Sequence, residues 1–232
     1  MPAMTALKGI SSMATRQVLN ELAQACEQRS GQAVDVESVG GVDAARRVAA
    51  GEALDFVVLA ADAIDKLIAS GQVLAGSRVD LVDSGVAIAV RAGAPRPDVS
   101  SEQALKRAVL AASSVGYSTG PSGVALVKLF ERWGIAAELQ GRLVQAPPGI
   151  PVGSLVARGE VALGFQQLSE LIHLQGIDVI GPMPAAVQIN TTFSGGICAK
   201  SSRPDAVRAM LAFMASPDAE EAKRRNGMAP AA

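Results

Sequence analysis

The chain has 232 residues, a formal net charge of -1, and 49% hydrophobic against 19% charged residues. These values are typical of one large globular domain or two smaller lobes, and they exclude a disordered chain. The near-neutral charge argues against nucleic acid as an obligatory partner, because phosphate binding needs a basic face. A single histidine, His173, and two cysteines in no zinc-like spacing exclude a metal site built on imidazoles.

The N-terminus carries no recognisable export signal. Residues 1–5 lead almost directly into a strand-like segment, without the basic start, apolar stretch and cleavage site of a secretory signal. No apolar run approaches the roughly 20 residues of a transmembrane helix, so we expect no membrane insertion. The sequence as it stands therefore predicts a cytoplasmic protein, or a periplasmic one if a signal peptide has been removed.

Strands and helices alternate along the chain, as judged from apolar runs, alternation and helical spacing. In chain order we predict strand Ala6–Ile10, a helix from Ser12 to Gly31, strand 34–36, helix Val42–Ala50, strand Phe56–Leu59, helix Asp62–Gly71, strand Val86–Val90, helix Ser101–Ala112, strand Val115–Tyr117, helix Ser122–Trp133, strand Leu163–Phe165, helix Gln167–Leu174, strand Val179–Ile180, extended segment Val187–Ala199, and helices Pro204–Ala215 and Asp218–Asn226. This order predicts an α/β fold with parallel sheets covered on both faces. Ligands of such sheets bind beyond the carboxyl ends of the strands.

Four turns that enter helices share one chemistry. They are Ser11-Ser12, Gly40-Gly41-Val42, the Ser118–Gly123 loop and the Pro147–Ser154 loop. Each offers free N–H groups at a helix start, with glycine for close approach and, in most of them, a serine or threonine hydroxyl. A single turn of this kind is usually an ordinary cap. Four of them in one chain predict an anion site that needs no lysine.

Five segments carry a resemblance to a known family. They are GISSMATRQVLNELAQ, SVGGVDAARRVAAGEALDFVVLA, STGPSGVALVKLFERWGI, PVGSLVARGEVALGFQQLSEL and RAMLAFMASPDAEEAKRRNGM. Over almost its full length the chain resembles the molybdate-binding branch of the type II periplasmic-binding-protein family. This group has relatives that are isomerases, and aconitate isomerase resembles it.

The resemblance implies two Rossmann-like α/β lobes joined by two crossover hinge strands. Lobe I would hold residues 1–83 and 190–232, and lobe II residues 84–189, with a small anion clamped in the interlobe cleft. Where the family often places a tyrosine, this chain has Gln166-Gln167. The predicted ligand-binding residues are Ser11, Ser12, Gly41, Val42, Ser118, Thr119, Ser122, Gly123, Pro151, Val152, Gln166, Gln167 and Arg16. Arg16 is either a bidentate carboxylate ligand or a solvated helix residue.

Two functions remain open. The first, which the sequence favours, is a solute-binding protein for a molybdate-like oxyanion or small carboxylate, with an ABC permease as partner if it is exported. The alternative is an isomerase that shifts a double bond in a small polycarboxylate, which requires a general base. The carboxylates nearest the turns are Glu37, Asp43 and Glu170, and the sequence singles out none of them. No nucleophile, phosphate-loop or dinucleotide motif is present, so no cofactor is expected.

Overall fold

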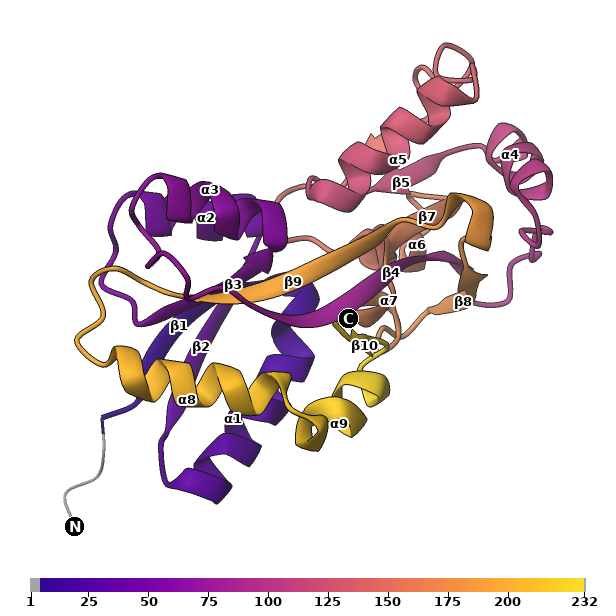
Figure 1. The fold of residues 1–232 in the computed structure, drawn as a ribbon. Coiled ribbons are helices and arrows are strands. Elements are labelled where there is room, and N and C mark those ends of the chain that lie inside the picture. Colours follow the sequence, from indigo (N-terminus) through magenta and orange to yellow (C-terminus); the bar gives the residue numbers. More distant parts are fainter. Residues whose placement is uncertain (1–4, 232) are drawn as a thin grey trace. The chain divides into compact units, whose positions relative to one another are not determined.

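The computed structural model describes residues 5–231. This part of the chain forms two compact units. Unit 1 contains the chain up to Asp83 and from Thr192 onward, and unit 2 contains Ser84–Thr191. The chain passes between the units twice, within strands β4 (Val79–Arg91) and β9 (Asn190–Ile197) (Figure 1).

Unit 1 is built on a mixed sheet. Strands β1 (Leu7–Ser12), β2 (Val34–Val39) and β3 (Phe56–Ala60) run parallel in the order β2-β1-β3. Strand β9 pairs antiparallel with β3, and the short β10 (Ala229–Pro230) pairs antiparallel with β4. The carboxyl ends of β1 and β2 therefore lie side by side, with Ser12 level with Val39.

Helices cover both faces of the unit 1 sheet. Phe56 and Val58 pack with α1 (Arg16–Ser30) and α8 (Pro204–Ala215), whereas Val57 and Leu59 pack with α2 (Gly41–Ala49) and α3 (Ala61–Ala69). Figure 1 shows these two pairs of helices on opposite sides of the strands. The continuous apolar run of β3 follows from this packing, because successive side chains of a strand point to opposite faces.

Unit 2 is also built on a mixed sheet, with a different strand order. Strand β5 (Val115–Tyr117) pairs parallel with β6 (Leu143–Gln145) and with β7 (Leu163–Gln167). Strand β4 pairs antiparallel with β7 and with β8 (Ile177–Pro182).

Helices also line both faces of the unit 2 sheet. Helices α4 (Glu102–Ala111) and α5 (Pro121–Arg132) pack in the main core of the unit. The shorter α6 (Val152–Ala157) and α7 (Leu168–Leu171) contribute to two smaller clusters. The remaining helix of the described chain, α9 (Glu220–Arg225), belongs to unit 1.

Three sequence predictions of local structure were wrong. The sheets are mixed rather than parallel, since β4 and β9 run antiparallel to their neighbours. The predicted extended segment Val187–Ala199 begins as a 3-10 turn at Ala185–Val187, and its strand starts only at Asn190. The predicted helix Gln167–Leu174 is a single turn, because the chain reverses toward β8 through Gly176, whose φ is 81°.

Strand β4 is longer than predicted. Polar residues at 80, 83 and 84 interrupt the apolar pattern, so the sequence did not predict the first half of this strand. In the structure the carboxylates of that half have hydroxyl partners on β9: Ser194 Oγ donates to Asp80 at 2.6 Å, and Thr192 Oγ1 donates to Asp83 at 2.6 Å. Asp80 is exposed and Asp83 is half-buried, and both continue the strand with hydroxyl partners that the sequence alone does not reveal.

Candidate functional site

The first two predicted turns come together in unit 1. Ser12 is the last residue of β1, and a methyl group placed on Gly41 would lie 3.7 Å from Ser12 Cβ. The Ser12 hydroxyl accepts a hydrogen bond from the Ala14 N–H at 3.2 Å, which leaves its own proton available to a ligand. Ser11 is fully buried, and its hydroxyl lies 2.8 Å from that of Ser38, so this pair links the ends of β1 and β2.

Helix α2 begins at Gly41 without a side-chain cap. Within the described residues, no hydrogen bond is made by the N–H groups of Gly41 and Val42, and the Val42 side chain is 66% exposed. Arg16 is the first residue of α1, is exposed, and has no ion pair in the described part of the chain. The unbonded N–H groups are suited to bind an anion, and the unpaired guanidinium is suited to bind a carboxylate. The assignment of Gly41, Val42 and Arg16 as ligand residues stays a prediction.

The third turn opens α5 in unit 2. The Ser118 and Ser122 hydroxyl oxygens are 3.3 Å apart, and Gly120 caps the helix through its backbone only. Strand β5 is in register with β7 at Gly116 and Gly164. Extending this register by two residues brings Ser118 level with Gln166, so the turn and the end of β7 share one edge of the sheet.

Gly123 in this turn is required by packing. A methyl group on it would lie 1.8 Å from the Ser118 carbonyl oxygen, whereas one on Gly120 would be 3.9 Å from its nearest neighbour, the Ser118 hydroxyl. We therefore expect Gly123→Ala to lower the free energy of unfolding by about 2–3 kcal/mol, because backbone must move to admit the side chain. Urea denaturation at neutral pH measures this, with Gly120→Ala as the matched control. Equal stability of the two variants would contradict the close contact.

The two adjacent glutamines have different surroundings. Gln166 Oε1 accepts a hydrogen bond from the Gly153 N–H at 3.3 Å, and Gln166 Nε2 donates to Glu170 Oε1 at 2.8 Å. Gln167 instead donates to Thr191 Oγ1 at 3.0 Å. Both side chains are buried, and as neighbours in β7 they point to opposite faces. Only Gln166 therefore faces α6 and the fourth turn.

The fourth turn contributes backbone alone. Pro151 caps α6 and has no N–H, and the Val152 side chain is fully buried. The Gly153 N–H is already used by Gln166. Of the two residues predicted here as ligands, Val152 can offer only its N–H, and Pro151 can offer no N–H donor; their contact with a ligand stays a prediction.

Glu170 is the ionisable group at this edge of the sheet. Burial raises its pKa to about 7, and the hydrogen bond from Gln166 opposes that rise. A carboxyl group with a pKa near 7 exchanges protons efficiently at neutral pH, which is the property of a general acid–base catalyst. The sequence contained Glu170 but gave no signal to prefer it, because desolvation is a product of the fold.

The other two nearby carboxylates are unsuited to this role. Glu37 accepts two hydrogen bonds of 2.8 Å from Arg47, which hold its pKa below the usual range. Asp43 is paired with Arg46 on the same helix. Both lie in unit 1, and both have a guanidinium partner. Among the three candidates, Glu170 is thus the one with the chemistry of a base at neutral pH.

The raised pKa of Glu170 predicts a pH-dependent stability. The group favours the folded state most when protonated, so its contribution is present below pH 4.5 and is lost as pH rises through 7. The wild type should therefore lose stability between pH 5 and pH 8, whereas Glu170→Gln should not lose this contribution. Relative to the wild type, the variant should gain about 2 kcal/mol in unfolding free energy over this range. Denaturation at the two pH values measures it. Glu160→Gln, at an exposed carboxylate paired with Arg158, should give a flat difference; a flat result for Glu170→Gln would contradict its burial.

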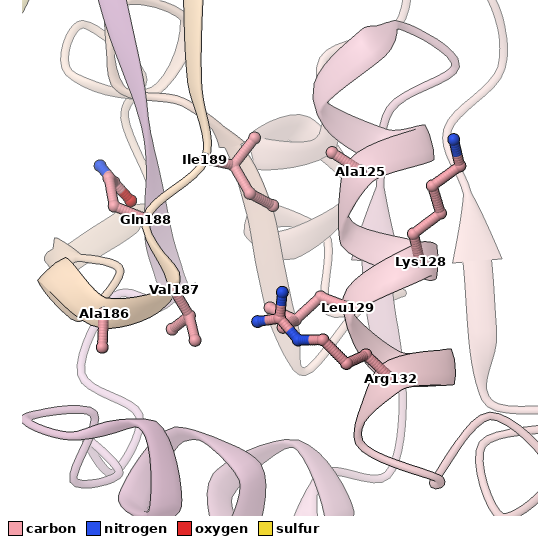
Figure 2. Close-up of a pocket in the computed structure, with 8 residues that line it drawn as sticks. All are labelled: Ala125, Lys128, Leu129, Arg132, Ala186, Val187, Gln188 and Ile189. Atoms are coloured by element: carbon pink, nitrogen blue, oxygen red, sulfur yellow. The ribbon is translucent and has the colours of Figure 1, made fainter.

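A pocket of about 410 Å³ lies elsewhere in unit 2, between α5 and the 186–189 segment (Figure 2). Its residues are Ala125, Lys128, Leu129, Arg132, Ala186, Val187, Gln188 and Ile189. None of the predicted ligand residues lines it. Over residues 5–231 there is no group of three metal-ligating side chains and no helix long and apolar enough to cross a membrane.

The described chain thus has a two-unit α/β fold with a mixed sheet in each unit. A profile of the family described as bacterial extracellular solute-binding protein matches residues 7–229, and the chain belongs to that family. It is 42% identical to an aconitate isomerase from a Pseudomonas species, over 97% of this chain and 88% of that protein.

Solved structures bear out the fold class predicted from the sequence. The periplasmic molybdate-binding protein of Azotobacter vinelandii superposes with a TM-score of 0.80 at 21% identity, over 97% of this chain and 100% of that one. A tungstate ABC transporter structure from Geobacter sulfurreducens superposes with a TM-score of 0.74 at 17% identity, over 95% and 98%. The resemblance to the molybdate-binding branch is thus confirmed at the level of fold.

Proposed function

We propose that this protein is an isomerase that moves a double bond in a small polycarboxylate, with aconitate as the substrate to test first. The observation that carries the proposal is Glu170. It is a largely buried carboxyl with a pKa of about 7, on the helix α7 that directly follows β7. The 42% identical aconitate isomerase supports the same reaction class.

The reaction needs one base and an environment that stabilises negative charge. Ionised Glu170 would remove a proton from the methylene carbon of the substrate, and the electron pair would delocalise through the double bond into a carboxylate. The protonated Glu170 would then return the proton to the former vinyl carbon, so that the double bond moves by one position. Atoms and charge balance without a cofactor. A pKa near 7 suits both half-reactions, since the group must accept and donate at the same pH.

The serine hydroxyls and backbone N–H groups would bind the substrate carboxylates and the enolate-like intermediate. In unit 2 we propose the hydroxyls of Ser118 and Ser122, which lie 3.3 Å apart, and that of Thr119 between them in sequence. Neutral donors that are fixed in advance stabilise developing charge without reorganising. In unit 1, Ser12, Gly41, Val42 and Arg16 stay proposed anion-binding residues on the chemistry of their own turns.

The competing proposal is a solute-binding protein without chemistry, exported and coupled to an ABC permease. The family and the molybdate- and tungstate-related folds favour it, but at 17–21% identity those structures argue for fold alone. A site that only binds an oxyanion gains nothing from a carboxyl group of raised pKa, because the ionised carboxylate would repel the ligand. Because of Glu170 we prefer the isomerase, although the sequence alone favours the solute-binding protein.

The test is direct conversion. The purified protein is incubated with cis-aconitate and with trans-aconitate in separate samples at pH 7, and ¹H NMR follows both isomers. We expect each sample to approach the same mixture. In D₂O, deuterium at the methylene carbon would report cleavage of the C–H bond. Samples without protein give the uncatalysed rate.

Thermal unfolding separates the two proposals. Molybdate, tungstate, sulfate and both aconitate isomers are added in turn, and a ligand at 100 times its Kd should stabilise the protein by about 2.7 kcal/mol. Stabilisation by molybdate or tungstate, with no conversion of aconitate, would overturn the isomerase and support the solute-binding protein. Stabilisation by aconitate together with conversion supports the isomerase.

A further inference from the structure

Gln166 occupies the space between a backbone donor and Glu170. Its side chain is 3% exposed, and both ends of its amide are engaged. The Gly153 N–H can only donate, so the oxygen of the amide must face it and the nitrogen must face Glu170. The orientation of this amide is therefore fixed by its partners. A side chain held in this way has little capacity left to bind a ligand, which is the role the sequence suggested for it.

The two oxygens of Glu170 are not equivalent. Oε1 accepts the hydrogen bond from Gln166 at 2.8 Å. For Oε2 no hydrogen bond is found within the described residues, and the residue keeps part of its surface exposed. A carboxylate oxygen that already accepts an amide N–H is the poorer proton acceptor of the two, because that bond stabilises its negative charge.

We infer that Gln166 is a positioning residue for Glu170, and that Glu170 Oε2 is the atom that exchanges the proton with the substrate. This inference rests on the isomerase function proposed above. The amide acts in two ways: it holds the carboxyl group in one orientation, and it favours the ionised form that burial alone would suppress. Gly153 at the start of α6 is the fixed point from which the amide is oriented.

Gln166 is the dominant polar neighbour of Glu170. Helix α7 packs against β7, and neither β7 nor α6 carries an ionisable side chain. On β8, Asp178 is paired with Arg96, and His173, three residues beyond Glu170, is exposed. The causes that act on Glu170 are burial and the Gln166 hydrogen bond, without a contribution from a charged group. Changing Gln166 should therefore act on Glu170 directly.

The test compares Gln166→Met with Gln167→Met in the full chain. Methionine keeps the length and apolar volume of glutamine but removes the donor. The pKa of Glu170 is measured by ¹³C NMR on protein labelled at the glutamate carboxyls, with the signal assigned by its loss in Glu170→Gln. The pH dependence of kcat/KM for aconitate is measured in parallel.

We expect Gln166→Met to move the Glu170 titration upward by about one pH unit, with the ascending limb of kcat/KM moving by the same amount. At pH 7, kcat should fall about 10- to 100-fold, and KM should change much less, because the loss is in orientation of the base. Gln167→Met, whose side chain contacts Thr191 instead, should leave the Glu170 titration in place. If Gln166→Met fails to fold, Gln166→Asn provides the second variant, since its amide is one methylene too short to bridge Gly153 and Glu170.

The readouts separate the two levels of the proposal. A Glu170 titration that does not move in either Gln166 variant would overturn the positioning role, whatever the activity. An upward shift together with no conversion of aconitate by the wild-type protein would overturn the isomerase, and with it the assignment of Oε2. An upward shift with the matching change in the kcat/KM profile supports both.

Discussion

Replacing Glu170 by glutamine is expected to lower kcat for aconitate isomerisation by about 10³-fold, with little change in substrate binding. Glutamine has nearly the same shape and can still contact Gln166, but it can neither accept nor donate the transferred proton. Initial rates by NMR at pH 7 measure the loss, and thermal stabilisation by aconitate measures binding.

The matched control for this prediction is Glu160→Gln. Glu160 is exposed, lies in the same unit and is paired with Arg158, so its loss should leave kcat within about twofold of wild type. A Glu170→Gln variant with wild-type activity would show that another group is the base. Such a result would keep the isomerase reaction and would overturn the assignment of Glu170 as its base.

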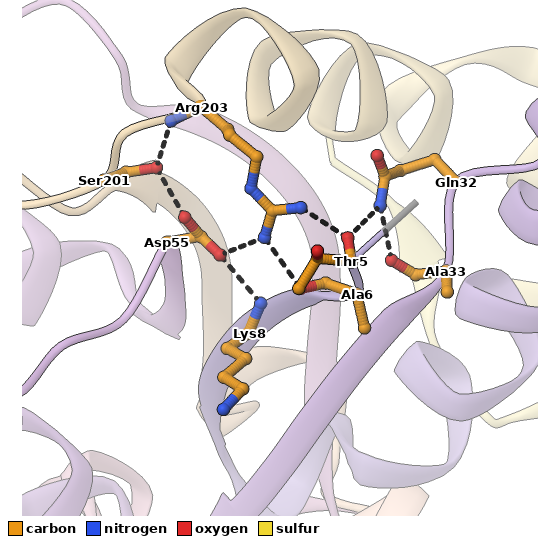
Figure 3. Close-up of polar contacts among 8 residues, drawn as sticks. All are labelled: Thr5, Ala6, Lys8, Gln32, Ala33, Asp55, Ser201 and Arg203. Atoms are coloured by element: carbon orange, nitrogen blue, oxygen red, sulfur yellow. Dashed lines mark hydrogen bonds and ion pairs between the residues drawn. The ribbon is translucent and has the colours of Figure 1, made fainter. Parts of the chain in front are cut away.

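The second large effect is expected at Asp55, in unit 1. Its carboxylate accepts hydrogen bonds from the Lys8 N–H at 2.9 Å, from the Ser201 hydroxyl at 2.7 Å and from Arg203 at 2.8 Å. Arg203 also donates to the carbonyl oxygens of Thr5 and Ala6 (Figure 3). One cluster thus joins the starts of β1 and β3 to the segment before α8.

We expect Asp55→Ala to lower the free energy of unfolding by about 4 kcal/mol at pH 7. The Asp55 side chain is only 13% exposed, so its removal leaves three donors, one of them a guanidinium, without their acceptor in a largely buried place. Urea denaturation followed by circular dichroism measures the change. The control is Asp62→Ala, where the carboxylate is 65% exposed and 3.6 Å from Lys66, and where we expect less than about 0.5 kcal/mol.

The effect of Asp55 should disappear in acid. Burial alone would raise its pKa, but the hydrogen bonds from Lys8, Ser201 and Arg203 together hold it below the usual range. A carboxyl with a lowered pKa stabilises the folded state above its unfolded pKa of 3.8, and that contribution is lost as pH falls through the folded value. The stability difference between the wild type and Asp55→Ala should therefore shrink as pH falls below 3.8. A difference that stays constant from pH 7 to pH 3 would contradict the role of the charge.

The sequence was sufficient for the elements whose signals are local. The apolar run at 56–60 predicted a strand buried on both faces, and the structure packs its alternate residues against different helices. The capping residues and glycines at 40–42 and 118–123 predicted helix starts, and α2 and α5 begin there. These predictions succeed because backbone propensity and side-chain periodicity act over a few residues.

Two features could not be predicted because they depend on partners distant in sequence. The first half of β4 escaped notice because Asp80 and Asp83 interrupt its pattern, and their hydroxyl partners lie more than 100 residues away on β9. The sequence predicted the same ligand-binding role for the two glutamines after Phe165. In the structure their side chains point to opposite faces of the strand and bond to different partners. Nothing within a short window of sequence distinguishes them.

By itself the sequence determined the class of fold, and it predicted which turns could bind an anion. Only the tertiary structure decided which carboxylate has the chemistry of a base. Glu37 and Asp43 have guanidinium partners, and the partner of Glu37 lowers its pKa, whereas Glu170 is largely buried beside a single amide. The pKa of a carboxyl group depends on desolvation and on neighbours brought from other elements, and both are set by the fold.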